Sequence, residues 1–154
     1  MSVSHDDILI VGSGIAGLTL GLCLQDKGIP CRILEKLPEI RPLGVGINVL
    51  PHATRVLSAL GLGAALDAVG VRTAEAGFFN RFGQLIFTDP LGVEAGYETP
   101  QYSIHRGDLQ QVLANAFVAR AGEEQLIKGV SCLGVTETRD GVTMALEDTK
   151  GRLL

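Results

Sequence analysis

Residues 8–17 read Ile-Leu-Ile-Val-Gly-Ser-Gly-Ile-Ala-Gly, and this stretch decides the fold of the chain. Four apolar residues in a row predict a buried strand, and the GxGxxG pattern that follows is typical of a tight turn into a helix. In such a turn Gly12 allows the sharp bend, Gly14 lets the backbone approach a pyrophosphate, and Gly17 lets the helix pack closely on the strand. The alternative is a glycine-rich turn that binds nothing.

A second strand with an acidic residue at its end supplies the context that this motif needs. We expect a helix over about residues 14–27, with Gly28 as its stop, and a strand over Cys31–Leu34. Glu35 then lies about twenty residues beyond the glycines, where a carboxylate that binds a ribose is found. Residues 8–37 are therefore predicted to form a βαβ unit with two parallel, adjacent strands and an anion site at the start of its helix.

Composition limits the classes of function. The chain has 154 residues, 46% of them hydrophobic, which is enough for a core, and its net charge of -4 gives no basic face for nucleic acid. Its three cysteines share no CxxC spacing and are expected to be reduced, largely buried thiols without a metal. The polar start does not resemble a signal peptide, and the apolar run after it is too short to span a membrane. We expect a cytoplasmic protein without a nucleic-acid partner and without a membrane span.

Further elements can be placed along the rest of the chain. Their periodicity predicts an α/β fold, namely a Rossmann-like βαβ sheet to which antiparallel β pieces are added. The expected elements are a glycine-marked loop at 38–48, a helix at 52–60, a hairpin at 76–88 that turns near 81–84, a short strand or turn at 102–106, a helix at 108–120, a strand at 125–137, and a turn at 139–141 into a strand at 142–147.

The end of the chain suggests a truncated fold. Leu154 follows a hairpin with no closing helix or strand, whereas a doubly wound sheet builds its crevice from strands on both sides of the switch point. We expect residues 1–75 to be the first part of a nucleotide-binding core, 76–101 to begin a substrate domain, and 102–154 to return to the nucleotide-binding domain, incompletely.

Four further segments carry a resemblance to a known family. Together with the opening turn, they are Glu35, the loop from Arg41 to Asn48, the helix end at 57–62, and His105-Arg-Gly-Asp-Leu-Gln110. In order and spacing the chain resembles the single-component FAD-dependent aromatic hydroxylases, which are flavoprotein monooxygenases, over essentially its whole length. Segments 40–48, 92–96 and 100–107 look most like the phenazine hydroxylases of that family.

The resemblance implies a chemistry. FAD would be the cofactor, NADH or NADPH the source of hydride, O₂ the co-substrate, and a small aromatic molecule, such as a phenazine, the substrate. The cofactor carries the reaction and the protein positions it, so no side chain here is expected to be a catalytic acid, base or nucleophile, and no metal is needed. The aromatic substrate, the choice of reductant and the oligomeric state stay open.

The resemblance also implies cofactor-binding residues, and a guanidinium suits a dianionic pyrophosphate. They are Gly12, Gly14, Ala16 and Gly17 at the pyrophosphate, Glu35 at the ribose with Lys36 beside it, Arg41 and the backbone of Val45, Gly46 and Ile47 near the flavin ring, Arg106 and Gln110 at the phosphate or ribitol side, and a main-chain group near Leu133 at adenine.

Each charged candidate has a simpler interpretation. Arg106 could be a surface ion-pair partner, although a cation is poorly placed near the start of a helix. Arg41 could cap a turn, and Lys36 could read a 2′-phosphate or be a solvated lysine at a strand end. His105 is expected to be structural, because nothing nearby completes a nucleophile or metal set. The four phenylalanines between residues 78 and 87 are expected to form the core of a sheet in the substrate domain.

Three functions remain open at this point. The chain could be the FAD-binding portion of a flavin monooxygenase, a non-catalytic dinucleotide-binding remnant, or an NAD-binding dehydrogenase domain. The loop at 44–48 and the helix start at 105–106 argue against the last, since they are flavin contacts in the resembling family. Made alone, the 154-residue chain is expected to hold FAD weakly or not at all, and to hydroxylate no substrate.

Overall fold

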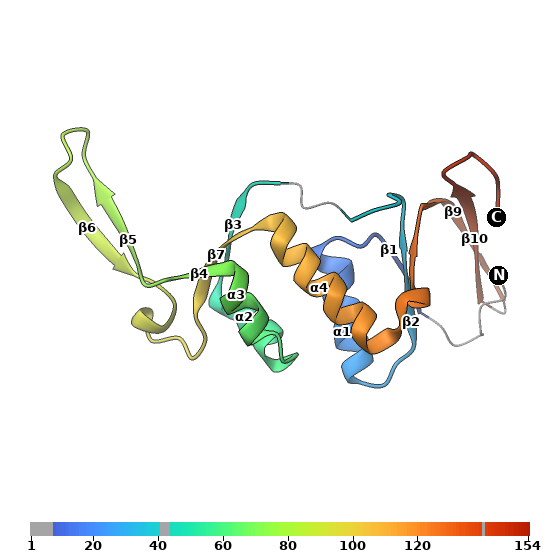
Figure 1. The fold of residues 1–154 in the computed structure, drawn as a ribbon, viewed down its shortest axis with the longest axis horizontal. Helices are drawn as coiled ribbons and strands as arrows, with labels where there is room; N and C mark the ends of the chain where they lie inside the picture. Colours follow the sequence, from blue (N-terminus) through green and yellow to red (C-terminus); the bar gives the residue numbers. More distant parts are fainter. Residues whose placement is uncertain (1–7, 41–43, 140) are drawn as a thin grey trace. The chain divides into compact units, whose positions relative to one another are not determined.

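The computed structural model of the chain describes residues 8–40, 44–139 and 141–154 (Figure 1). By packing, the chain divides into two compact units. The first comprises Met1–Arg41 and Leu113–Leu154, and the second Pro42–Val112. Among the described residues, no helix has the length and apolar character to cross a membrane.

The first unit contains the βαβ motif that the opening stretch predicts. Strand β1 (Ile8–Val11) leads through the glycine turn into helix α1 (Ile15–Asp26), and strand β2 (Cys31–Glu35) follows. The two strands are parallel and adjacent, with Ile8 opposite Cys31 and Val11 opposite Leu34. Strand β8 (Leu126–Lys128) pairs in parallel with the other edge of β2, so β2 is the central strand. The predicted βαβ unit is therefore confirmed.

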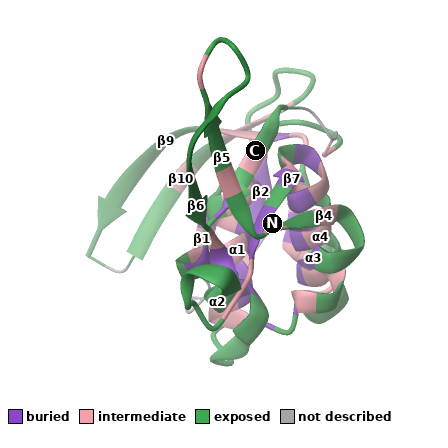
Figure 2. Ribbon diagram, turned by 90° about the vertical axis from the view of Figure 1, so that its left-hand side faces the viewer, coloured by how far each residue is buried: buried purple, intermediate pink, exposed green. Residues whose placement is uncertain are grey.

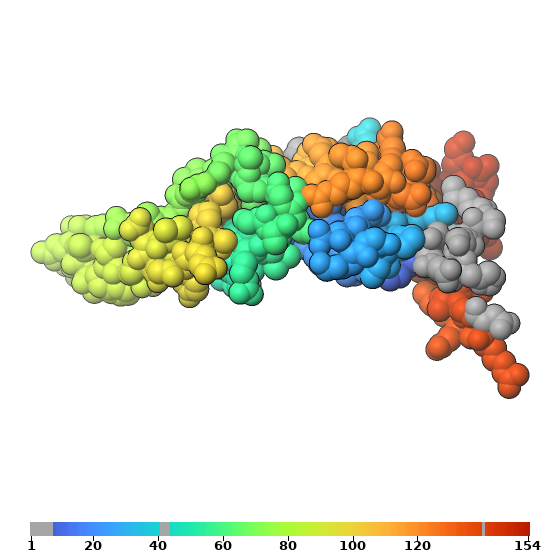
Figure 3. All heavy atoms as spheres, turned by 90° about the horizontal axis from the view of Figure 1, so that it is seen from below, coloured from blue at the N-terminus to red at the C-terminus, as the bar shows by residue number. Residues whose placement is uncertain are grey.

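The core of this unit lies between the sheet and two helices. Leu18 and Leu22 of α1 and Ile33 of β2 are fully buried. Figure 2 colours the buried part of α1 purple. Helix α4 (Arg106–Ala121) contributes Phe117 from its second half. A Cβ added to Gly21 would lie 2.8 Å from the Phe117 ring, so α1 and the later half of α4 are in close contact, and their surfaces adjoin in Figure 3.

The second unit is built on an antiparallel sheet. Strand β7 (Gln101–His105) is central, between β3 (Gly46–Val49) and β4 (Gly70–Thr73). Its Tyr102 and Ile104 are buried beside Leu66 and Leu57 of two short helices. These are α2 (Pro51–Ala59) and α3 (Gly63–Val69), and a 3₁₀ turn, η1 (Gly92–Ala95), precedes β7.

Two hairpins complete the chain. Strands β5 (Glu75–Phe79) and β6 (Leu85–Pro90) form the hairpin predicted at 76–88, and β9 (Val130–Thr138) pairs with β10 (Gly141–Asp148) after a short 3₁₀ turn, η2 (Glu123–Gln125). The expected phenylalanine core is not found within the described residues. Phe78 and Phe87 stack with ring centroids 4.3 Å apart, but all four side chains, Phe79 and Phe82 included, are exposed. The β5–β6 hairpin is mostly green, the colour of exposed residues, in Figure 2.

Other departures from the sequence-based prediction have local causes. The loop expected at 38–48 ends early, because residues from Gly46 onward pair with β7. The single strand expected at 125–137 is two strands, because Gly129 has φ +75° and breaks the extended run. Helix α3 was not predicted, since a seven-residue helix shows little periodicity. The compact units do not follow the predicted limits at 75 and 101, and the assignment of domains by function stays a prediction.

Candidate functional site

The glycine turn between β1 and α1 is fixed by the backbone of the sheet. Gly12 has φ +98°, a left-handed conformation that favours glycine, and its N–H donates to the Leu34 carbonyl of β2 at 2.7 Å. A Cβ on Gly17 would collide with the carbonyl oxygen of Gly12. The first and third glycines of the motif are therefore required by the fold itself.

Gly14 has a different explanation. Its φ of −68° and ψ of 176° suit any residue, and a Cβ built on it meets no atom of the described residues within 4 Å. Neither the turn nor the packing of α1 requires a glycine here. Gly14 is the N-cap of α1, where the first N–H groups lack partners within the helix and favour anions. A pyrophosphate that approaches the backbone fits the space that a side chain would fill.

The Glu35 carboxylate lies beside this turn. Its Oε2 accepts two hydrogen bonds from Ser13, one from the backbone N–H at 2.9 Å and one from the hydroxyl at 2.7 Å, and its Oε1 accepts the Leu37 N–H at 2.9 Å. A carboxylate offers about four acceptor positions. Three of them are used by the described residues, so Glu35 can accept a further bond from a hydroxyl, as a ribose provides.

These contacts also set the charge of Glu35, which is only 9% exposed. Burial by itself raises the pKa of this carboxyl, but the hydrogen bonds from Leu37 and Ser13 and the nearby charge of Lys36 together lower the pKa below its ordinary value of 4.5. Glu35 is therefore an anion near neutral pH, and it acts as a hydrogen-bond acceptor.

The remaining candidates of the first unit are on its surface. Ala16 is exposed in the first turn of α1, and Lys36 is exposed directly after β2. Leu133 lies on β9 with its side chain 55% exposed. The structure thus brings Glu35 to the glycine turn, whereas the cofactor roles of these three residues stay predictions.

The loop candidates of the second unit lie at the start of β3. Val45 and Gly46 are exposed, and the Arg106 N–H donates to the Val45 carbonyl at 3.1 Å. Gly44, just before them, has φ +138°, and a Cβ there would lie 3.2 Å from the Cβ of Arg106. Arg41 lies outside the described residues.

Arg106 is the first residue of α4, and its side chain is exposed. A cation at this end of a helix opposes the helix dipole, so the position does not favour arginine for the sake of the helix. An anionic partner for the guanidinium would account for it. Gln110 lies one turn later on the same helix and is half-buried. The flavin roles of both residues stay predictions.

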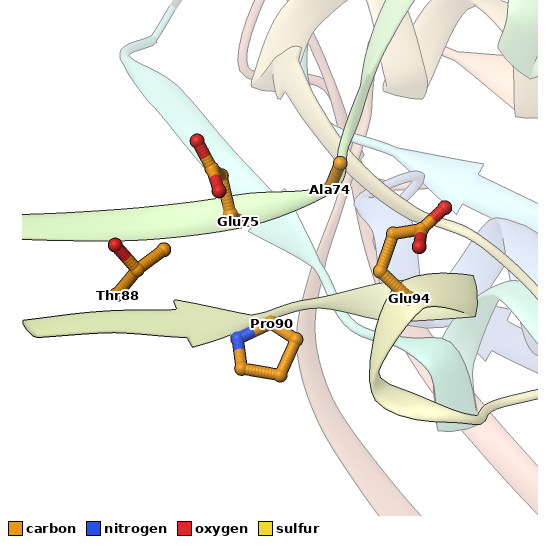
Figure 4. Close-up of a pocket in the computed structure, with 5 residues that line it drawn as sticks. All are labelled: Ala74, Glu75, Thr88, Pro90 and Glu94. Carbon is orange, nitrogen blue, oxygen red and sulfur yellow. The ribbon is translucent and has the colours of Figure 1, made fainter.

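A shallow pocket in the second unit contains none of the candidate residues (Figure 4). Two of its lining residues, Glu75 of β5 and Glu94 of η1, carry carboxylates. The others are Ala74, Thr88 and Pro90. Nothing in the sequence points to this pocket, and no function is assigned to it.

Sequence reasoning missed one residue at this site, Ser13, and gave another, His105, only a structural role. Ser13 is fully buried and supplies two of the three hydrogen bonds to Glu35, yet it occupies a variable position of the GxGxxG pattern. A hydroxyl inside a tight turn is the signal that could have found it. His105 was expected to be structural, and its ring nitrogen Nε2 lies 3.1 Å from the Gly44 carbonyl oxygen.

Comparison with known proteins gives consistent matches along nearly the whole chain. A family model described as FAD binding domain matches residues 5–152. A phenazine 1,6-dicarboxylic acid hydroxylase of Lysobacter antibioticus is 42% identical over 148 residues, which cover 96% of this chain and 36% of that protein. A 3-amino-4-hydroxybenzoate 2-monooxygenase of Streptomyces cremeus is 38% identical over 144 residues, with 92% and 36% covered. The chain thus spans little more than a third of the length of these relatives.

Solved structures show the same fold. The p-nitrophenol 4-monooxygenase of Pseudomonas putida DLL-E4 aligns with a TM-score of 0.81 at 19% identity, over 95% of this chain and 38% of that one. At this level of identity the likeness concerns the fold alone. It agrees with the predicted α/β class, in which a βαβ sheet is combined with antiparallel strands.

Proposed function

The chain belongs to the FAD binding domain family, and on that premise we propose that it binds the adenosine half of FAD at the turn from Gly12 to Gly17. The N–H groups at the start of α1 bind the pyrophosphate, and Glu35 accepts hydrogen bonds from the ribose hydroxyls. Leu133 provides a main-chain contact for adenine. Lys36, directly after Glu35, adds a positive charge at the end of β2, beside the ribose.

One observation carries this proposal more than the others. Gly14 is unstrained and has free space around its missing side chain, so packing among the described residues does not explain a glycine there. Close approach of a ligand to the backbone does explain it. The hydrogen-bonded Glu35 carboxylate supports the same interpretation, because an ionised acceptor beside the turn suits a sugar better than a second phosphate.

The flavin half of the cofactor is assigned to residues of the second unit. Arg106, helped by Gln110, binds the phosphate or ribitol side, and the backbone of Val45–Ile47 contacts the ring, with Arg41 nearby. When bound, the flavin supplies the redox chemistry with O₂, and these residues bind and orient it. We propose no catalytic acid, base or nucleophile among them.

The activity that suits this family membership is that of a flavin-dependent monooxygenase. We propose that NADH or NADPH provides the hydride and that a small aromatic compound is hydroxylated. The similarity to a phenazine dicarboxylic acid hydroxylase supports a phenazine-type substrate. A cytoplasmic location is part of the same proposal. Membership of an FAD-binding family argues against an NAD-binding dehydrogenase domain.

Titration of the 15N-labelled 154-residue chain with ADP tests the proposal directly. ADP carries the groups assigned to the first unit, and NMR detects weak binding residue by residue. We expect shifts at the amides of Gly12–Gly17 and Lys36, and FAD should move the same signals. A chain in which ADP leaves these signals unchanged would contradict the proposal.

A further inference from the structure

The exposed loop that leads into β3 is held by two consecutive residues, His105 and Arg106. His105 Nε2 lies 3.1 Å from the Gly44 carbonyl oxygen, and the Arg106 N–H donates to the Val45 carbonyl, also at 3.1 Å. Gly46 pairs with His105 in the β3–β7 ladder. Three successive residues of the loop are thus fixed from one side.

The side chains of Gly44, Val45 and Gly46 do not anchor their own backbone within the described structure. Gly44 has φ +138°, a conformation that other residues rarely adopt, and glycine carries no side chain that could anchor it. Val45 is 72% exposed, and a Cβ on Gly46 would meet no atom of the described residues within 4 Å. Among the described residues, the backbone of Gly44, Val45 and Gly46 is therefore held by contacts from residues 105 and 106.

The Gly44 carbonyl oxygen determines which ring nitrogen of His105 carries the hydrogen. A carbonyl oxygen only accepts hydrogen bonds, so the Nε2 atom must carry the hydrogen and donate it to Gly44. The other ring nitrogen, Nδ1, then faces Asp108 in the first turn of α4, with Oδ1 at 3.8 Å. The imidazole thus lies between the loop and the helix start.

We propose that His105 is a positioning residue for the flavin half of FAD. Its Nε2–H holds Gly44–Gly46 in the orientation in which the loop's backbone contacts the flavin. This inference rests on the proposed function, which assigns that backbone to the ring. His105 itself acts through the loop and touches no part of the cofactor.

Three variants separate this role from a merely structural one. His105→Leu removes the donor, and His105→Gln keeps an amide donor about as far from the backbone as Nε2. The matched control is His52→Leu, at an exposed histidine of α2 in the same unit. Each 154-residue chain is titrated with ADP and with FAD, followed by NMR and by flavin absorbance.

We expect His105→Leu to bind FAD about three- to tenfold more weakly than the unmodified chain, which is the effect of one hydrogen bond. Its affinity for ADP should be unchanged, because ADP lacks the flavin half. His105→Gln should recover most of the FAD affinity, and His52→Leu should match the unmodified chain. The His105 side chain is 39% exposed, so both substitutions are expected to be tolerated in the folded state.

Other outcomes overturn the inference. It is wrong if His105→Leu binds FAD as the unmodified chain does, or if it loses ADP and FAD affinity equally. Failure of His105→Gln to recover FAD affinity would also contradict it. Should the leucine variant not fold, His105→Asn gives the same test, since its shorter amide does not reach Gly44. The inference is also wrong if the unmodified chain binds FAD no more tightly than ADP, because the flavin half would then make no contact with the loop. An unmodified chain that shows no ADP binding would instead refute the proposed function itself.

Discussion

Ser13 donates two hydrogen bonds to a single oxygen of Glu35, from its backbone N–H and from its hydroxyl. These bonds join the glycine turn that follows β1 to the end of β2, across 22 residues of sequence. Both residues are buried, so the pair is shielded from water. The position of the carboxylate beside the turn is therefore built into the fold of the first unit.

Ser13→Ala should destabilise the chain. The substitution removes the hydroxyl donor and leaves a buried carboxylate with one partner fewer. A hydrogen bond to a charged group contributes about 1.5–3 kcal/mol, so we expect a loss of that size in the free energy of unfolding, measured with urea. The exposed Ser58→Ala on α2 is the control and should unfold as the unmodified chain does. Equal stability of both variants would show that the hydroxyl contact contributes nothing.

Gly17→Ala should disturb the turn itself. The added methyl group would collide with the Gly12 carbonyl, so α1 must move away from the strand. Overpacking of this kind costs about 1–3 kcal/mol, measurable by thermal unfolding. Gly134→Ala on β9 is the control, because a Cβ there meets no atom of the described residues within 4 Å. The packing argument fails if Gly17→Ala is as stable as this control.

The Glu35 carboxylate predicts a dependence of stability on pH. Its pKa in the folded chain is lower than the ordinary 4.5, so folding favours the ionised form. The stabilisation is complete above pH 4.5 and is lost as the pH falls through the folded pKa. Urea unfolding of the unmodified chain and of Glu35→Gln should therefore differ most near neutral pH and converge in acid. A difference that does not change with pH would contradict this account.

A second carboxylate ties α3 to the sheet of the second unit. Asp67 accepts the Arg72 guanidinium through both oxygens, at 2.7 and 2.6 Å, and the buried Tyr102 hydroxyl at 2.7 Å. The hydrogen bonds from Arg72, and then from Tyr102, lower the pKa of Asp67 from 3.8 to about 2. This stabilisation is present above pH 3.8 and is lost as the pH falls toward 2.

An NMR titration of the Asp67 carboxyl carbon measures this pKa. Tyr102→Phe removes one donor, and Arg72→Gln removes the charge and the paired hydrogen bonds. We expect the pKa of Asp67 to rise toward 3.8 in both variants, and further in Arg72→Gln, because the Arg72 hydrogen bond is the largest cause of the shift. A titration of the unmodified chain near 3.8 would contradict the described contacts.

The parts of the fold that the sequence predicted are those with a local signal. The apolar run before Gly12 and the acid at Glu35 define the βαβ unit, because strand, turn and helix follow one another within a few residues. Strand β3 escaped prediction because its partner, β7, lies more than fifty residues away, as the pairing of Gly46 with His105 shows. The sequence predicted one continuous strand across Gly129. The structure has two strands there, β8 and β9, because the φ of +75° at Gly129 interrupts the extended backbone.

The candidate site, like the fold, was predicted only where the sequence carries a local signal. The spacing between Gly12 and Glu35 placed the carboxylate at the turn, since Gly12 directly follows β1 and Glu35 ends the neighbouring parallel strand β2. Ser13 was missed because a pattern of glycines says nothing about the side chains between them. The exposure of Phe78 and Phe87 could not be read from the sequence either, because an apolar hairpin does not reveal which of its faces will be covered.

The substitution Gly14→Ala tests the central claim most directly, because it separates binding from folding. Alanine is a poorer N-cap than glycine, so a loss of at most about 1 kcal/mol in stability is expected. The added methyl group occupies the space assigned to the pyrophosphate, and ADP and FAD should then no longer shift the amides of the turn in NMR titrations. A folded Gly14→Ala chain that binds ADP as the unmodified chain does would contradict the claim that this turn binds the cofactor.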